Sequence, residues 1–155
     1  MDSAPPKTPA TPADIKRYRA NYQGEIDGVE LYRRLSRAEK DPERAKIFLD
    51  LAETEKRHVR MWADRLRDAG VDPGEPRPTL RVRMLGFLAD RLGTRAVLPM
   101  VSAMESSGFD NYMAQTEAGP SMARDERSHS RALTTLSGQA TSGTEPSAVI
   151  TRNER

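Results

Sequence analysis

The sequence predicts an all-α fold: a four-helix bundle of two antiparallel hairpins, joined by a long crossover with a short extra helix. Three observations support this class. Hydrophobic residues make up only 36% and charged residues 31% of the chain, a balance typical of long amphipathic helices with solvated outer faces. Apolar residues recur every three or four positions along four long stretches. Segments rich in proline and glycine separate these stretches.

Start and stop signals define the first hairpin. Residues 1–11 are rich in proline and alanine and are expected to be disordered. Thr11-Pro12 then offers a cap and a proline at the first helical position, and the helix should end near Lys40. Asp41-Pro42 repeats the signal, and the second helix should stop at Gly70. Because the connection is short, the two helices should be antiparallel neighbours.

A crossover is predicted between the hairpins. Residues 71–78 hold three prolines and a glycine and cannot be helical. Residues 79–92 form a short basic amphipathic helix with an apolar face that includes Leu80, Met84 and Phe87. Two interpretations of this helix remain open. It contacts an anionic membrane surface, or it covers one side of the bundle.

The second hairpin follows the crossover. A third long helix is expected to start between Thr94 and Pro99, and a fourth to run from the break at residues 119–121 to about Leu136. Residues 139–155 are rich in serine, threonine and glycine and then charged, which predicts a flexible tail. One domain, residues 12–138, should therefore hold the whole bundle.

Composition excludes several classes of function. The sequence has no cysteine, so disulfides, thiolate catalysis and Cys-ligated metals are excluded, and any metal must bind through oxygen and nitrogen. The net charge is only +2 and acids alternate with bases, so no nucleic-acid partner is expected. Residues 1–12 lack the apolar core of a signal peptide, and no apolar run is long enough to span a bilayer. The chain as given is expected to be soluble.

Both histidines of the chain occur in the same motif, Glu-x-x-His, at Glu55–His58 and Glu126–His129. Residues three apart share a helix face, so each motif directs one carboxylate and one imidazole to the same side. Two such motifs on two helices, together with one glutamate from each of two further helices, are the ligand set of a dinuclear metal site in a four-helix bundle. The remaining helices must supply those two glutamates.

The third helix offers only Glu105, whereas the first offers Glu25 and Glu30. We favour Glu25, because the apolar stripe of its helix flanks it. A repeat supports this choice: Tyr32 follows Glu25 by seven residues, and Tyr112 follows Glu105 by seven. Since seven residues make two helical turns, each tyrosine lies on the face of its glutamate.

The predicted metal ligands are therefore Glu25, Glu55, His58, Glu105, Glu126 and His129. Oxygen and imidazole ligands suit iron, manganese or zinc, and four carboxylates would balance two divalent ions. We hypothesise that Glu55 and Glu126 bridge the ions, with Glu25 and His58 completing one site and Glu105 and His129 the other. Three aromatic residues are candidates for outer contacts or for plain core packing: Tyr32, Tyr112 and Trp62.

The chain resembles rubrerythrin-type members of the ferritin-like superfamily. The residues that carry this resemblance are Gly24-Glu25 with Tyr32, Glu55-Lys56-Arg57-His58, Glu105, and Asp125-Glu126-Arg127-Ser128-His129. Within that group it is most similar to the cytosolic domain of membrane-bound ferritins, which precedes a membrane domain of the vacuolar-iron-transporter type. That similarity lies at Leu98-Pro99, at residues 123–127 and at residues 150–155.

The resemblance implies a ferritin-like bundle with two iron ions, for which manganese or zinc could substitute. It implies that the domain binds and oxidises Fe(II) on the cytoplasmic side, and supplies or regulates iron export by a fused or adjacent membrane transporter domain. The residues themselves suggest a homodimer, since Gly24 and Gly28 permit close helix approach. Two alternatives stay open: a stand-alone rubrerythrin-like peroxidase and a non-catalytic helical interaction domain.

Two departures weigh against the peroxidase. Classical rubrerythrins carry a further glutamate three residues after the ligand of the third helix, and this chain has Gly108 there. They also carry a Cys-ligated iron domain, which a chain without cysteine cannot form.

Overall fold

The computed structural model of the chain describes residues 9–113, 115 and 119–141, without the side chains of residues 106–113, 119–120 and 139–141. The side chain of Tyr112 therefore lies outside the described residues. So do residues 1–8 of the predicted disordered segment 1–11 and residues 142–155 of the predicted tail 139–155.

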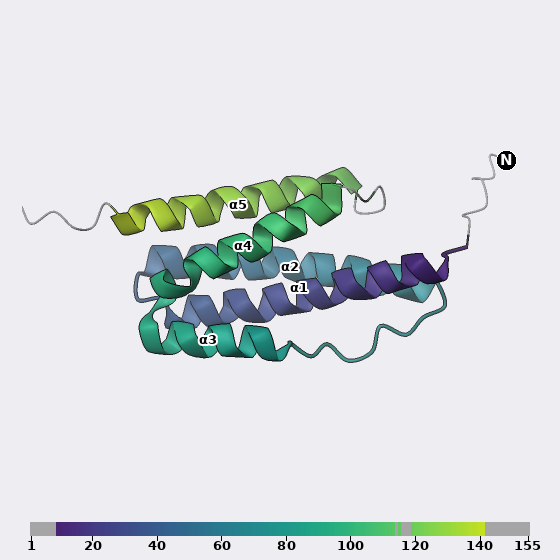
Figure 1. Cartoon of the computed structure of the whole chain (residues 1–155), viewed down its shortest axis with the longest axis horizontal. Helices are drawn as coiled ribbons and strands as arrows, with labels where there is room; N and C mark the ends of the chain where they lie inside the picture. The colour runs from purple at the N-terminus through teal and green to yellow at the C-terminus, as the bar shows by residue number, and fades with distance from the viewer. Residues whose placement is uncertain (1–8, 114, 116–118, 142–155) are drawn as a thin grey trace, which may run out of the picture.

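Five helices account for almost all of the described residues, which contain no strand. They are α1 (Pro12–Ala38), α2 (Pro42–Asp68), α3 (Leu80–Leu92), α4 (Thr94–Met113) and α5 (Gly119–Thr141). Helices α1 and α2 form one antiparallel hairpin and α4 and α5 the other, while α3 lies along α1 on the side away from α5 (Figure 1). The predicted fold class, two hairpins joined by a crossover with a short helix, is confirmed.

Local capping fixes the ends of the first hairpin. The backbone N–H of Asp14 donates to Thr11 Oγ1 at 3.2 Å, and the Thr11 N–H donates to Asp14 Oδ2 at 2.8 Å. Asp41 Oδ1 likewise accepts from the N–H of Glu43 at 2.9 Å. Each such cap stabilises a helix by about 1 kcal/mol. Gly70, with φ of 73°, follows the C-cap of α2, as the sequence predicts.

The crossover is fastened to α1 by side chains. Asp27 accepts hydrogen bonds from the backbone N–H of Thr79 at 2.8 Å and from its hydroxyl at 2.7 Å. The amide of Gln23 donates to the carbonyl of Arg77 at 3.0 Å. These bonds place the start of α3, whose own cap residue makes no side-chain cap hydrogen bond.

The apolar face predicted for α3 is wrong in part. Leu80, Met84 and Phe87 point to solvent, and the helix instead buries a different stripe. That stripe consists of Val82, Leu85, Gly86 and Ala89. Small residues decide the orientation, because they let α3 approach α1 closely. A Cβ added at Gly86 would lie 2.1 Å from Cδ of Arg34, which crosses the helix there.

The fourth long helix is longer than the sequence predicts. Helix α5 begins at Gly119, inside the expected break, and continues to Thr141, past the expected end at Leu136. Gly138 lies exposed within it. A glycine inside a helix costs only about 1 kcal/mol, which the neighbouring residues can offset.

Two apolar clusters fill the interior. The larger contains Tyr32, Phe48, Leu98, Leu133 and Leu136 among its buried members, and the smaller contains Tyr18, Tyr22, Ile26, Trp62, Leu66 and Met122. Along α2 and α5, the predicted metal ligands lie between the residues of the two clusters, and on α1 Glu25 lies beside Tyr22 and Ile26 of the smaller cluster. The bundle therefore holds a polar centre enclosed by hydrophobic layers on both sides.

Candidate metal centre

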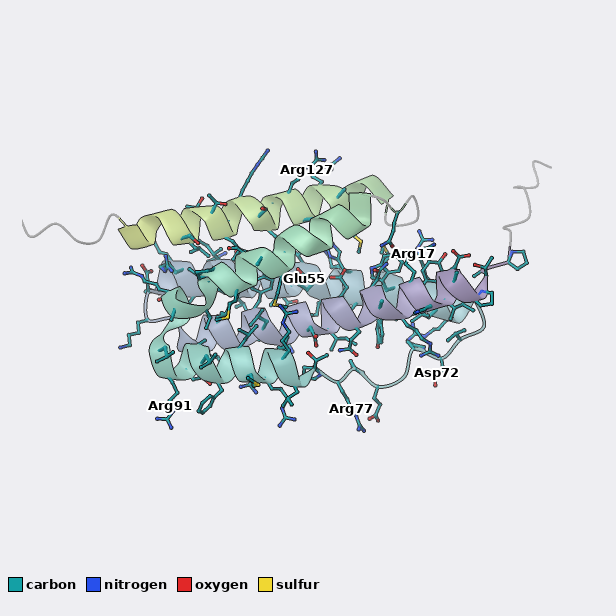
Figure 2. The ribbon with its side chains drawn as sticks, in the orientation of Figure 1. Arg17, Glu55, Asp72, Arg77, Arg91 and Arg127 are labelled. Carbon is teal, nitrogen blue, oxygen red and sulfur yellow. The ribbon has the colours of Figure 1, made fainter. Side chains whose placement is uncertain are left out.

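The structure brings the six predicted ligands together from four helices. Their ligand atoms form two groups, and within each group all atoms lie within 4.8 Å of one another. One group is Glu25, Glu55, His58 and Glu126, and the other is Glu55, Glu105, Glu126 and His129. Glu55 and Glu126 belong to both groups, as expected of bridging carboxylates. Figure 2 shows Glu55 in the middle of the bundle, where the two hairpins face each other. The metal-binding roles themselves stay predictions.

These side chains are buried despite their charge. Glu25, at 3% exposed, is typical, and only Glu105 is partly open, with a side-chain exposure of 13%. Buried ionised groups are normally paired or bound to metals, because removing them from water is costly. Glu30, the rejected alternative on α1, instead pairs on the surface with Arg34 at 2.7 Å. The structure thus places Glu25 at the centre and Glu30 outside it.

The imidazole of His58 is oriented by its two nitrogens. Nε2 lies 3.0 Å from Oδ2 of Asp125. Nδ1 faces three carboxylates, at 3.4 Å from Glu25, 3.5 Å from Glu55 and 4.0 Å from Glu126. It is buried and has no hydrogen bond of acceptable geometry to any described residue. Nδ1 is therefore the nitrogen available to a metal.

His129 has a similar position in the second group. Its Nδ1 lies 3.0 Å from Glu55 and 3.8 Å from Glu105. Both ring nitrogens are buried, and neither finds a well-oriented hydrogen-bond partner among the described residues. An unsatisfied buried nitrogen costs about 1–3 kcal/mol. Orphaned imidazole nitrogens beside four carboxylates fit a pair of divalent ions, which would bind one nitrogen of each ring together with the carboxylates.

Without metal, the centre retains protons on its carboxylates. Burial raises the pKa of Glu25 to about 8, and the neighbouring Glu55 adds to the rise. Burial likewise raises the pKa of Glu126 to about 9, helped by the charges of Glu105 and Glu55. Burial alone would also raise the pKa of Glu55, but its interactions with Glu25 and both histidines lower it far below its usual value. Glu55 is thus an ionised carboxylate at neutral pH.

The histidines are protonated in the metal-free centre. Burial alone would lower their pKa values, but the carboxylates around them reverse the effect. Glu25 and Glu55 raise the pKa of His58 to about 11, and Glu105 and Glu55 raise that of His129 to about 10. The metal-free centre is thus held together by protons, which metal ions would displace.

Tyr32 connects the two hairpins at this centre. Its fully buried hydroxyl donates a hydrogen bond to Oε1 of Glu105. Burial first, and then the charge of Glu105, raise its pKa well above the usual value, so the hydroxyl keeps its proton. Although Tyr32 shares a helix with Glu25, it reaches the glutamate of α4. Trp62 packs on Tyr18, with ring centroids 5.6 Å apart, in the smaller apolar cluster.

Sequence reasoning gave no role to Asp125, which orients His58. Its place directly before Glu126 turns it toward α2 instead of the centre. A signal was available, because metal-binding histidines usually donate their second ring nitrogen to a carboxylate or carbonyl. We expect Asp125→Ala to weaken Mn(II) binding by about 10- to 100-fold, measured by isothermal titration calorimetry. Asp64→Ala, which removes an exposed carboxylate of α2, is the control. Equal affinity in the two variants would show that Asp125 does not orient the ligand.

Sequence reasoning also gave no role at the metal centre to Gly28, which leaves space for the side chain of Glu55. A Cβ at this position would lie 3.1 Å from Cγ and 3.2 Å from Cδ of Glu55. The close approach that glycine permits is thus used inside the chain, between α1 and the carboxylate of α2. We expect Gly28→Ala to displace Glu55 and to weaken metal binding about tenfold, despite a gain of up to about 1 kcal/mol in helix propensity.

Gly24→Ala is the matched control for this change, one turn earlier on α1. Apart from its chain neighbours and the backbone of its own helix, no described atom lies within 4 Å of a Cβ added there. The control should gain the same helix propensity and bind metal like the parent. Mn(II) titrations of both variants, combined with urea denaturation of the metal-free proteins, separate the two effects. Unchanged metal binding in Gly28→Ala would contradict this role for the glycine.

A four-helix bundle with two Glu-x-x-His pairs and two further glutamates around a buried centre defines the class of dinuclear metal carboxylate proteins. A family model described as Rubrerythrin matches residues 19–105. Because this match spans more than half of the chain, the protein belongs to the rubrerythrin family, and its bundle is ferritin-like. Glu126 and His129 lie beyond the matched residues, and it is the fold that joins them to the other four. Neither the curated proteins nor the solved structures gave a match.

None of the described helices combines the length and the apolar character needed to cross a membrane.

Proposed function

We propose that this domain binds two iron ions at the buried centre and oxidises Fe(II). One observation carries the proposal: Glu55 and Glu126 each belong to both ligand groups, beside histidine nitrogens that lack hydrogen-bond partners among the described residues. Glu25 and His58 would complete the first position, and Glu105 and His129 the second. Manganese or zinc could occupy the same oxygen and nitrogen ligands.

Residues around the centre would hold the ligands in place. Asp125 fixes the His58 ring through Nε2, which leaves Nδ1 for the metal. Tyr32 fixes one oxygen of Glu105, leaving the other free. The apolar clusters on both sides exclude water. Two bound Fe(II) ions would supply the two electrons that, with two protons, convert dioxygen to hydrogen peroxide or hydrogen peroxide to water.

The cellular context is a further part of the proposal. The similarity of Leu98-Pro99 and residues 123–127 to membrane-bound ferritins supports a role in supplying or regulating iron export, beside a fused or adjacent membrane transporter domain. In that setting the domain would act on the cytoplasmic side, as a homodimer.

Anaerobic loading followed by oxygen tests the proposal. The parent protein should bind two equivalents of Fe(II) without oxygen and, on exposure to air, oxidise them faster than free Fe(II), seen as Fe(III) absorbance in the near ultraviolet. Glu126→Ala should show only the rate of free Fe(II). Slow reaction with oxygen but rapid turnover with hydrogen peroxide and a reductant would identify a peroxidase instead. Failure to bind Fe(II) or Mn(II) would indicate a non-catalytic interaction domain.

A further inference from the structure

The outer face of α3 exposes a row of large apolar side chains. Leu80, Met84 and Phe87 are 69%, 59% and 55% exposed, and Leu92 is 66% exposed. Among the described residues, only two other large hydrophobic side chains are strongly exposed, Leu49 at 46% and Met100 at 43%. The spacing of four and then three residues places Leu80, Met84 and Phe87 in one stripe. This stripe is opposite the buried stripe, so packing within the chain does not account for it.

Arginines surround the apolar row. Arg81, Arg83 and Arg91 are exposed, and residues 80–92 contain a single acidic residue, Asp90. The guanidinium of Arg91 lies over the ring of Phe87, 5.4 Å from its centroid. In Figure 2 the side chains of Arg91 and Arg77 extend away from the bundle on the side of α3, whereas Arg127 lies on the opposite side.

A shallow hollow lies on this same face, with a volume of about 260 Å³. It combines two arginines with apolar walls. The residues that line it are Arg34, Leu80, Arg83, Met84 and Phe87. Arg34 is held across Gly86 and paired with Glu30 at 2.7 Å, so the rim of the hollow is fixed in position.

We propose that the outer face of α3 docks on the surface of an anionic lipid bilayer. An interfacial helix places apolar side chains at the boundary of the acyl chains, and its arginines extend to the lipid phosphates. Charge decides between the possible occupants. A second copy of this chain, related by a two-fold axis, would bring the same arginines face to face, which costs free energy. An anionic surface complements the apolar row and the arginines together. The two interpretations of α3 from the sequence then apply to different faces: its inner face covers one side of the bundle, and its outer face contacts the anionic membrane surface.

Sedimentation with vesicles tests this docking with the complete chain. Binding should be strong to vesicles of equal parts phosphatidylcholine and phosphatidylglycerol, weak to phosphatidylcholine alone, and largely lost on the order of 0.5 M salt. Arg91→Ala should lower the partition coefficient of the protein between water and the mixed vesicles about fivefold, which is the effect of one basic residue at an anionic surface. Phe87→Asp should weaken it by about tenfold or more.

Matched controls lie on other helices. Arg127→Ala removes an exposed arginine from α5, and Leu49→Asp alters an apolar side chain of α2 that is 46% exposed. Both should bind mixed vesicles like the parent, and all four variants should melt like the parent because the changed side chains are exposed. Metal loading should not alter vesicle binding, so this test is independent of the iron centre.

Three results would overturn the proposal. One is equal binding, or none, to neutral and mixed vesicles. Another is an equal loss in the controls and in the α3 variants. The third is self-association in analytical ultracentrifugation that Phe87→Asp abolishes, which would assign the face to a second copy of the chain.

Discussion

Glu55→Ala is expected to abolish metal binding at both positions of the centre, whereas Glu25→Ala should remove only one ion. The reason is the place of each carboxylate. Glu55 belongs to both ligand groups and approaches both histidines, at 3.5 Å from His58 and 3.0 Å from His129. Glu25 belongs to the first group only. Elemental analysis after loading with Mn(II) and desalting gives the number of ions bound to each variant.

The stabilisation of each variant by bound metal should follow the number of ions that it binds. A ligand present at about a hundred times its dissociation constant stabilises a protein by about 2.7 kcal/mol, and Glu55→Ala should lose this entire gain. The metal-free variant will itself be weakened, because His58 and His129 lose a carboxylate neighbour. Each variant must therefore be compared with itself, with and without Mn(II), in urea denaturation. Glu55→Gln preserves the shape of the side chain but not its charge, and it should behave like the alanine variant. Two ions bound to Glu55→Ala would refute the bridging role.

Features that depend on neighbours along the chain could be predicted from sequence. Helix starts at Pro12 and Pro42 and the stop at Gly70 follow from capping chemistry within four residues. The two Glu-x-x-His motifs were recognisable because helical spacing alone puts their side chains on one face. The choice of Glu25 over Glu30 rested on the apolar stripe of α1 and on the repeated seven-residue spacing between glutamate and tyrosine.

Features that depend on another helix were missed or incomplete. The bond from Asp125 to His58 joins α5 to α2, and the bond from Tyr32 to Glu105 joins α1 to α4. The spacing of residues within one helix does not determine which residues of two packed helices lie opposite each other. The sequence suggested that Gly28 permits the close approach of another chain. In the structure, Gly28 lies against the side chain of Glu55 of the same chain.

The outward face of α3 shows a second limit. Periodicity identifies an amphipathic helix, but α3 has two candidate stripes, and the one with larger apolar residues is outside. Gly86 and Ala89 decide the matter, because small residues let the helix backbone approach α1. A rule that assigns the most hydrophobic stripe to the core therefore gives the wrong orientation here.

The stabilisation produced by metal should increase with pH between about pH 6 and pH 8. In the metal-free protein, Glu25 and Glu126 have pKa values raised from 4.5 to about 8 and about 9. His58 and His129 have values raised from 6.5 to about 11 and about 10. A raised pKa contributes stability that is complete below the ordinary pKa and is lost as the pH rises through the folded value. Glu55, whose pKa is lowered, contributes fully above 4.5 and is constant in this range.

The metal-free protein should therefore weaken as the pH rises, while metal binding improves because fewer protons must be displaced. The stabilisation by metal depends only on the affinity, so it increases with pH while the metal-free protein itself becomes less stable. Each proton released on binding changes the affinity tenfold per pH unit, or about 1.4 kcal/mol. Melting curves with and without Mn(II), which avoids oxidation, measure the difference across the range. Calorimetric titrations in two buffers of different ionisation enthalpy count the protons, with several released per pair of ions. Stabilisation that does not change with pH, with no proton release, would mean that these four side chains do not bind the metal.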